Sequence, residues 1–254
     1  MKNNSSNILL IGMGEIGSSI KKLYDSYSEY KVYYLDVKIE NEQNIPKSIE
    51  VMHINIPYSE KFIEIVSDYI EKYNPNLTII NSTVKIGTTK QIRKFTNKKV
   101  IHSPVMGVHP YLTESMRTFI KIIGGETLKE SLLASEHFES IGVKSLIYRT
   151  SSDSEAAKLL DTTYYMYNIF FNKKVWKLCK ENNLNFDDVY TTTNEIYNDG
   201  YEKMGMKHVC RPILKYIKGR ILGHCLEPNA LLLEDKFPLC KLLLSWNEEE
   251  KNVT

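Results

Sequence analysis

A cysteine stands in a glycine-punctuated stretch near the C-terminal end of the chain, where residues 219–228 read GRILGHCLEP. Cys225 directly follows Gly223 and His224, and it could be a nucleophile, a metal ligand or an ordinary buried thiol. A nucleophilic cysteine needs partly exposed, electropositive surroundings in which its thiolate is accessible. We expect no metal site, because His224-Cys225 lacks a spaced pair of ligands and no CxxC pair occurs. The cysteines are Cys179, Cys210, Cys225 and Cys240.

A glycine pattern near the N-terminus is typical of dinucleotide binding. Gly12, Gly14 and Gly17 follow a strand-like apolar run and open a helical pattern, which is the context that the GxGxxG fingerprint requires. The first glycine permits a tight turn, the second lets the backbone approach a pyrophosphate, and the third allows close packing of helix and strand. Free N–H groups at the helix start, at Glu15 and Ile16, favour phosphate. The alternative is a glycine-rich turn that binds no ligand.

Asp36 ends the second strand-like run, at the distance from the glycines where an acidic side chain binds the ribose 2′-hydroxyl. A carboxylate at this position would repel the 2′-phosphate of NADP, so the sequence predicts NAD as the cofactor. The alternative is that Asp36 is a plain residue at the end of a strand.

Alternating strand and helix patterns over the first 150 residues would position these groups. The expected strands are the short apolar runs at 7–12, 31–37, 51–55, 76–82, 98–104 and 119–125. The clearest amphipathic helices are 15–27 and 59–73. This alternation predicts an α/β fold, a Rossmann-like, doubly wound and mostly parallel sheet with helices on both faces. Residues 1–150 are therefore the expected NAD-binding domain.

Residues 151–254 are expected to form a helical domain for substrate binding and dimerisation, built on a long central helix. The stretch 152–182 contains no Gly or Pro and opens with N-capping residue types. Its aromatic side chains are too many for one solvated face, so they pack in the core or form a subunit interface, and we predict a homodimer. Further helices are expected over 186–198 and from Asn229, followed by a frayed C-terminal tail.

Three later segments resemble the nucleotide-sugar 6-dehydrogenases, a family that oxidises UDP-glucose, GDP-mannose or UDP-N-acetylmannosamine. Residues 81–89, NSTVKIGTT, are similar to the family's STVxxGTT stretch, and residues 155–159, EAAKL, to its E-x-x-K-L helix start. Residues 223–225 are similar to its G-[GS]-[HS]-C motif. The order and approximate spacing match from the glycine loop to residue 233. The resemblance implies cofactor contacts from Ser82 and Thr83, and catalytic roles for Thr83, Lys158 and Cys225.

The resemblance also implies a reaction. In the family, two NAD oxidise a primary alcohol to an acid, and the cysteine thiolate traps the intermediate aldehyde as a thiohemiacetal that becomes a thioester and is hydrolysed. Lys158 would stabilise developing oxyanion charge, and together with His224 it would make the surroundings of Cys225 electropositive. The expected substrate is therefore a sugar-like or nucleotide-sugar molecule with an alcohol or aldehyde group.

The chain departs from the family at positions that activate water and hold the nucleotide. Val105 follows Pro104 where the family has Glu, Thr162 stands in place of Asn, and Asn229 stands in place of the water-activating Asp. The sequence also ends where the family continues into a third, nucleotide-binding domain, so we expect a truncated and divergent relative. Two alternatives stay open. One is a two-electron β-hydroxyacid-type dehydrogenase, which needs a helix lysine but no cysteine, and the other is a non-catalytic dinucleotide-binding paralogue.

Each catalytic candidate also has a purely structural alternative. Cys225 could be a small buried hydrophobe, Lys158 a solvated helix lysine, and Thr83 a helix cap after a strand. His102 and His109 flank the segment SPVMGV, a position that suits acid or base chemistry. Because a buried histidine is also commonly a satisfied core group, we assign neither a catalytic role.

Composition argues against several other functions. The 33 Lys and Arg residues nearly balance the 31 Asp and Glu, and the net charge of +2 provides no strong field for nucleic acid or an anionic membrane. Apolar stretches are too short to span a bilayer, and no basic region followed by an apolar run marks a signal peptide. We therefore expect a cytoplasmic protein with free thiols, whose partners are a small-molecule substrate and a second copy of itself.

Overall fold

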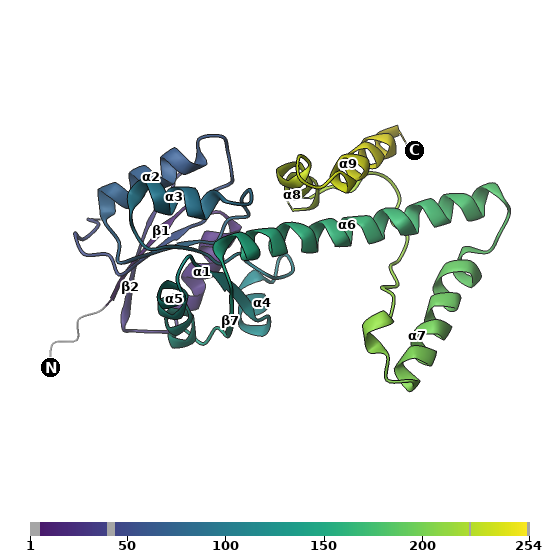
Figure 1. Ribbon diagram of the computed structural model, residues 1–254, viewed down its shortest axis with the longest axis horizontal. Coiled ribbons are helices and arrows are strands. Elements are labelled where there is room, and N and C mark those ends of the chain that lie inside the picture. Colours follow the sequence, from purple (N-terminus) through teal and green to yellow (C-terminus); the bar gives the residue numbers. More distant parts are fainter. Residues whose placement is uncertain (1–5, 40–43, 224, 253–254) are drawn as a thin grey trace. The chain divides into compact units, whose positions relative to one another are not determined.

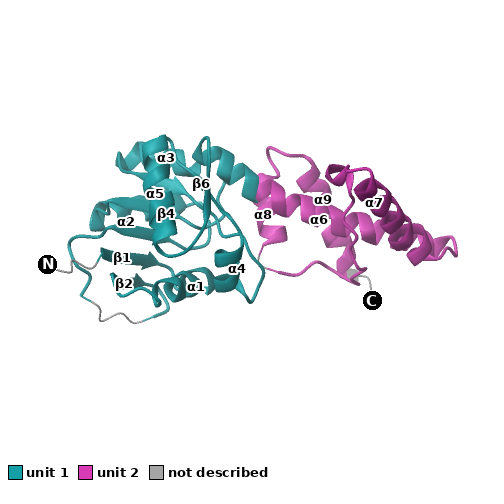
Figure 2. Ribbon diagram, turned by 90° about the horizontal axis from the view of Figure 1, so that it is seen from below, with its two compact units in different colours: residues 1–158 teal, residues 159–254 magenta. Residues whose placement is uncertain are grey.

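The computed structural model describes residues 6–39, 44–223 and 225–252 (Figure 1). The chain divides into two compact units, residues 1–158 and residues 159–254 (Figure 2). The first unit contains the strands together with several helices, and the second unit is helical.

A seven-stranded, mostly parallel sheet forms the centre of the first unit. Its strands are β1 Ser6–Ile11, β2 Tyr30–Leu35, β3 Val51–Ile54, β4 Leu77–Ile80, β5 Val100–His102, β6 Lys121–Gly124 and β7 Ser145–Tyr148. They lie in the order β2-β1-β3-β4-β5-β6-β7, and only β5 and β6 pair antiparallel among these described strands. The expected α/β fold and all six expected strands are confirmed, whereas β7 is a strand that the sequence patterns do not predict.

Helices cover both faces of this sheet because side chains alternate along each strand. The helices are α1 Glu15–Tyr24, α2 Phe62–Tyr73, α3 Thr88–Thr96, α4 Leu112–Thr118 and α5 Leu128–Ser140. Ile8 and Leu10 of β1 belong to one buried cluster with side chains of α1, α4 and α5. Leu9 and Ile11 belong to the other cluster, with side chains of α2 and α3. The doubly wound architecture follows directly from this alternation.

The second unit is built on α6, Ser151–Glu181, whose first residues belong to the first unit. This helix confirms the expected long central helix. A π-helical segment and three α-helices follow it, at Asp187–Thr192, α7 Thr193–Lys203, α8 Leu226–Leu233 and α9 Leu239–Glu249.

Two expectations for the second unit are wrong in detail. α8 begins at Leu226 rather than near Asn229, because Pro228 fits the first turn of a helix, where its missing N–H is not needed. The expected frayed tail is wrong for residues 248–252. A 3-10 turn, Glu250–Asn252, follows α9, and the Glu250 carboxylate pairs with Lys173.

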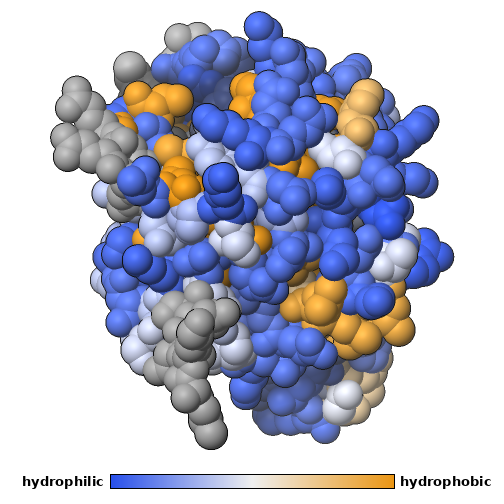
Figure 3. Space-filling model, turned by 90° about the vertical axis from the view of Figure 1, so that its left-hand side faces the viewer, coloured by the Kyte–Doolittle hydropathy of each residue, from blue (hydrophilic) through white to orange (hydrophobic). Residues whose placement is uncertain are grey.

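The surface shown in Figure 3 is largely hydrophilic, with separate hydrophobic patches. One exposed apolar row lies on α5 and contains Leu128, Leu132 and Leu133. Within the described ranges, no helix combines the length and the apolar character needed to cross a membrane. Across the same residues, no three His, Cys, Asp or Glu side chains gather as metal ligands would.

Candidate active site

The glycine loop lies where the strand order reverses. β1 has β2 on one side and β3 on the other. The loop after β1 therefore lies at the carboxyl edge of the sheet, where the connection from β1 and the connection from β3 run to opposite sides. In open α/β sheets this switch point is where ligands bind. Gly12 has a φ of +88°, and a Cβ there would stand 3.0 Å from the Asn55 carbonyl oxygen. The turn therefore requires glycine at its first position.

The third glycine brings α1 against this turn. A Cβ at Gly17 would lie 2.0 Å from the Gly12 carbonyl oxygen, a distance that no packed side chain tolerates. Gly14 is the N-cap of α1, and no side chain caps the N–H groups of the first turn. A Cβ at Gly14 would meet nothing within 4 Å, so the loop is open on that side. The N–H groups of Glu15, Ile16 and Gly17 in this turn have no helical partner and suit a phosphate group.

Asp36 connects the glycine loop to the end of β2. Its Oδ2 accepts a hydrogen bond from the Met13 N–H at 2.7 Å, and its Oδ1 accepts one from the Lys38 N–H at 2.8 Å. These two backbone bonds lower the pKa of the Asp36 carboxyl, so it stays anionic. Each oxygen keeps a further lone pair, so the carboxylate retains the capacity to accept a ribose hydroxyl.

The chain should bind NAD at least about tenfold more tightly than NADP, since the anionic Asp36 would oppose a 2′-phosphate. Titration calorimetry with both cofactors measures the ratio. Asp36→Asn should reduce the preference, whereas Asp25→Asn should leave it unchanged, because Asp25 is engaged on α1 with Lys21. Equal or tighter NADP binding would remove the role assigned to Asp36, and binding of neither cofactor would remove the dinucleotide site.

The loop after β4 carries Ser82 and Thr83. The Ser82 hydroxyl donates to the Ile56 carbonyl oxygen at 2.6 Å, and the Ser82 carbonyl oxygen lies 3.2 Å from His102 Nε2. Thr83 is half-buried in the loop. The N-cap of α3 is Gly87, so Thr83 is not the helix cap that the structural alternative required.

Glu155 is a site residue to which the sequence patterns assign no role, although it stands in the EAAKL segment. Its carboxylate accepts bonds from the N–H groups of Gly87 and Thr89, at 2.6 and 2.8 Å, and from the Thr89 hydroxyl at 2.6 Å. Gly87 has no side chain with which to cap α3, so a carboxylate from α6 does so instead. Burial raises the pKa of Glu155 to about 6, against the lowering effect of these hydrogen bonds. These bonds fix the end of the Thr83 loop that leads into α3.

Lys158 follows Glu155 by one helical turn and is half-buried, which argues against a freely solvated side chain. Its positive charge acts on the interior of the first unit. Burial is the main reason for the lowered pKa values of His102 and Lys121, and the charge of Lys158 is a smaller one.

The two histidines that flank SPVMGV both have partners. His102 is a satisfied core group, paired through Nδ1 with the Ser154 hydroxyl at 2.8 Å. His109 pairs with Glu15, its Nδ1 lying 3.0 Å from the carboxylate.

Lys121 is a buried lysine that the sequence patterns also do not single out. Its Nζ donates to the carbonyl oxygens of Ser103 and Pro104, at 2.8 and 3.0 Å. Burial and, to a smaller extent, the charge of Lys158 lower the pKa of Lys121 to about 7. A lysine at the first residue of a short strand carries no periodic signal, so only the fold reveals that its ammonium group lies inside.

Cys225 belongs to the second unit, where it is half-buried and immediately precedes α8. Cys225 is therefore not fully buried as an ordinary core thiol would be, whereas Cys179 and Cys240 are buried. Two of the departures from the family pattern meet in this unit, because the Asn229 side-chain N–H donates to the Thr162 hydroxyl at 3.2 Å, and both side chains are buried. His224, proposed as part of the surroundings of Cys225, lies outside the described residues.

Comparison with known proteins relates this architecture to one group of enzymes. No protein-family profile matches the chain. A UDP-N-acetyl-D-mannosamine dehydrogenase from Methanococcus maripaludis (strain C7) is 25% identical over the whole chain, which covers 56% of that protein. A second, from Methanocaldococcus jannaschii, is 27% identical over 76% of the chain and 43% of its own length. The chain is similar in sequence to these nucleotide-sugar dehydrogenases. It spans about half the length of the curated relatives that it matches.

Solved structures agree with this relationship at the level of the fold. The UDP-D-ManNAc dehydrogenase of Pyrococcus horikoshii superimposes with a TM-score of 0.76 at 18% identity, covering 96% of this chain and 68% of that one. The fold is shared more widely than the nucleotide-sugar dehydrogenases. A 3-hydroxyisobutyrate dehydrogenase from Mycobacterium tuberculosis gives a TM-score of 0.70 at 12% identity, over 98% of this chain and 96% of that one. The fold alone therefore does not choose between the two reaction types.

Proposed function

We propose that this chain is an NAD-dependent oxidoreductase that acts on an alcohol or aldehyde group of a sugar-like or nucleotide-sugar substrate. The observation that carries the proposal is the glycine loop at the switch point, with Gly17 packed on Gly12 and Asp36 bonded to the Met13 N–H. The relatives named above add the class of substrate.

The residues of the first unit fit NAD. The uncapped N–H groups of α1 suit its pyrophosphate, the Asp36 carboxylate suits its ribose hydroxyls, and the loop of Ser82 and Thr83 opens at the same carboxyl edge of the sheet. When bound, NAD accepts a hydride from the substrate carbon. Lys158 would stabilise negative charge on the substrate oxygen as that carbon is oxidised.

Cys225 would carry a second oxidation. Its thiolate sulfur adds to the carbonyl carbon of the aldehyde, and the carbonyl oxygen takes a proton to complete the thiohemiacetal. With a second NAD as the oxidant, loss of a hydride from that carbon and of the proton from its hydroxyl group would leave a thioester on Cys225. Water cleaves the carbon–sulfur bond and releases a carboxylate and the free cysteine.

The last step should be slow, because this chain has an amide where the family has a carboxylate. The Asn229 side chain cannot take a proton from water, and its N–H group already donates to Thr162. We expect a burst of about one aldehyde equivalent per site followed by stalling, which rapid-quench measurements with NAD detect. Asn229→Asp should shorten the stall.

Selective alkylation tests Cys225 itself. In the native chain Cys225 should react with iodoacetamide faster than Cys179, Cys210 and Cys240, and Cys225→Ser should eliminate the burst while a single hydride transfer survives. Peptide mass spectrometry gives the rate at each thiol. Labelling of Cys225 only after denaturation would identify a structural thiol and remove the nucleophile.

A two-electron β-hydroxyacid-type dehydrogenase is the second candidate function. It is favoured by the match to the 3-hydroxyisobutyrate dehydrogenase over nearly the full length of both chains. In that case Cys225→Ser should leave the full native rate, while Lys158→Met should eliminate it. A non-catalytic dinucleotide-binding paralogue is the third reading, and turnover of any substrate removes it.

We also propose that the chain is a homodimer that pairs through α6. Phe170 of this helix is buried and Trp176 stacks on Tyr216 at 4.2 Å, but Tyr164, Tyr165 and Phe171 are 60%, 51% and 49% exposed. Aromatic side chains of this size seldom stay solvated together, and a second copy would cover them. Light scattering at micromolar concentration should give twice the chain mass, and Tyr165→Glu should give the monomer. A monomeric native chain would remove this proposal.

A further inference from the structure

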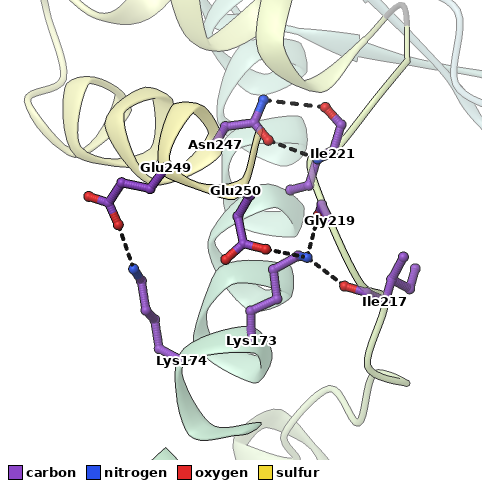
Figure 4. A network of polar contacts seen from close by, with 8 residues as sticks. All are labelled: Lys173, Lys174, Ile217, Gly219, Ile221, Asn247, Glu249 and Glu250. Atoms are coloured by element: carbon purple, nitrogen blue, oxygen red, sulfur yellow. Dashed lines mark hydrogen bonds and ion pairs between the residues drawn. The ribbon is translucent and has the colours of Figure 1, made fainter. Parts of the chain in front are cut away.

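The segment that leads to Cys225 is held by the side chain of Asn247, on α9 (Figure 4). Its Oδ1 accepts the Ile221 N–H at 2.8 Å and its Nδ2 donates to the Ile221 carbonyl oxygen at 3.3 Å. The same Nδ2 lies 3.3 Å from Oε2 of Glu227, in the first turn of α8. Asn247 is 1% exposed. One buried amide therefore holds the chain on both sides of Cys225.

Two charged pairs strengthen this arrangement. Arg220 pairs with Glu227, which closes the same loop from its outer side. Lys173 of α6 donates to the carbonyl oxygens of Ile217 and Gly219 and pairs with Glu250 at 3.1 Å (Figure 4). The Lys173 side chain is only 2% exposed, so all its bonding is directed at this segment and at the turn that follows α9.

The neighbouring lysine shows what an ordinary ion pair on this helix looks like. Lys174 pairs with Glu249 at 3.1 Å, but its side chain is 35% exposed and Glu249 is 59% exposed. Figure 4 draws Lys174 bonded to Glu249 alone, with no contact to the segment before Cys225. The two adjacent lysines thus differ in burial and in their partners, because Lys173 is buried and donates to carbonyl groups of this segment.

We propose that Asn247 and Lys173 are positioning residues for the candidate nucleophile, because they fix residues 217–223 and the first turn of α8, on either side of the Cys225 thiol. The inference rests on the function proposed above for Cys225, but the contacts themselves do not. A loop that contains Gly219 and Gly223, both with positive φ, has little stiffness of its own. Its order must therefore come from side chains outside it, and these two supply hydrogen bonds to its backbone.

The test compares Lys173→Met and Asn247→Asp with the control Lys174→Met in the full-length chain. Iodoacetamide labelling of Cys225, followed by peptide mass spectrometry well below the thermal midpoint of each variant, gives the rate. We expect Lys173→Met and Asn247→Asp to shift the Cys225 rate at least about fivefold toward that of the denatured chain, because loosening the segment removes the thiol from the environment that sets its reactivity. Lys174→Met should stay within about twofold of the native rate.

A conservative variant and local hydrogen exchange distinguish a positioning role of Lys173 from a general effect on stability. Lys173→Arg keeps a cation with several donors and should restore the native labelling rate, while hydrogen exchange at residues 217–223 should quicken in Lys173→Met and stay slow in α8 and α9. A Cys225 rate that is unchanged in both test variants while circular dichroism shows a folded chain would overturn the proposal. If Lys173→Met does not fold, the Cys225 labelling rates of Asn247→Asp and Lys173→Arg are compared instead. Labelling needs no substrate, so a native chain that labels at Cys225 but oxidises nothing would refute the proposed function and leave the positioning role standing.

Discussion

Alanine at position 17 should abolish dinucleotide binding and strongly destabilise the first unit. The new methyl group would stand 2.0 Å from the Gly12 carbonyl oxygen, and this neighbour is backbone that cannot rotate aside. Relief requires α1 to move away from β1, which displaces the N–H groups offered to the pyrophosphate. We expect Gly17→Ala to lose about 3 kcal/mol in the free energy of unfolding and to show no measurable heat of NAD binding.

Gly14→Ala is the matched control, because the same chemical change meets nothing within 4 Å. It should keep the native free energy of unfolding to within about 1 kcal/mol, because the methyl group meets no neighbour and the only cost is the lower preference of Ala than of Gly for an N-cap. Its NAD affinity should still fall at least about tenfold, because the methyl group occupies the side from which a pyrophosphate approaches. Equal stability of the two variants would show that α1 does not depend on the close contact at Gly17.

Acidification from about pH 7 to pH 5 should destabilise the first unit, above the pH range in which ordinary carboxylates titrate. Burial lowers the pKa of His102 to about 3 and that of His137 to about 4, and it lowers the pKa of His53 well below its usual range. His53 and His137 both lie within hydrogen-bond distance of the buried Tyr24 hydroxyl, at 2.7 and 2.5 Å. All three imidazoles are therefore neutral in the folded chain and become protonated on unfolding below their usual pKa of 6.5.

The direction of the pH dependence follows from proton binding. Between about pH 4 and pH 6.5 the unfolded chain binds more protons at these histidines, so each lowers the free energy of unfolding by about 1.4 kcal/mol per pH unit as the pH falls. Glu155, with its pKa raised to about 6, binds its proton more tightly when folded and opposes this trend with a single proton. The net effect should lower the thermal midpoint by more than about 10 °C from about pH 7 to pH 5.

Single histidine variants identify the source of this acid sensitivity. His137→Gln keeps an acceptor for the Tyr24 hydroxyl and should flatten the net pH slope by about half, because the three histidines are opposed by Glu155 and one of the two protons that remain in the net balance is lost. Calorimetric scans across the pH range give the slopes. A midpoint that stays constant down to about pH 5 would show that the buried imidazoles are not the sensitive groups.

The fold follows from local patterns to a large extent, because apolar runs bounded by Gly, Asn and Pro identify buried strands wherever a strand is covered on both faces. β7 escapes this reasoning, since it lies at the edge of the sheet and its four residues are all partly or well exposed. A half-exposed edge strand has no continuous apolar run, so its position depends on pairing with β6 rather than on its own sequence.

The parts of the site that lie within one short segment can be predicted from the sequence. The parts that form when distant segments come together cannot. The glycine loop is of the first kind, because turn, helix start and packing contact lie within six consecutive residues. Glu155 and Asn247 are of the second kind. Glu155 bonds to Thr89 across 66 positions and Asn247 to Ile221 across 26, and neither pair leaves a periodic signal. Only the fold reveals that a carboxylate and an amide hold the loops that carry the candidate catalytic residues.

The bonds made by the first turn of α6 determine how much of the chain an excised nucleotide-binding fragment must contain. The alternation of strand and helix patterns places the end of that domain at residue 150, four residues before Ser154 and five before Glu155. A fragment cut there would lose the carboxylate that caps α3 and the hydroxyl group that satisfies His102. Autonomous folding of the Rossmann-like half therefore requires the chain to continue through at least the first two turns of the long helix, which serves as the last structural element of the sheet domain before it becomes the first of the helical one.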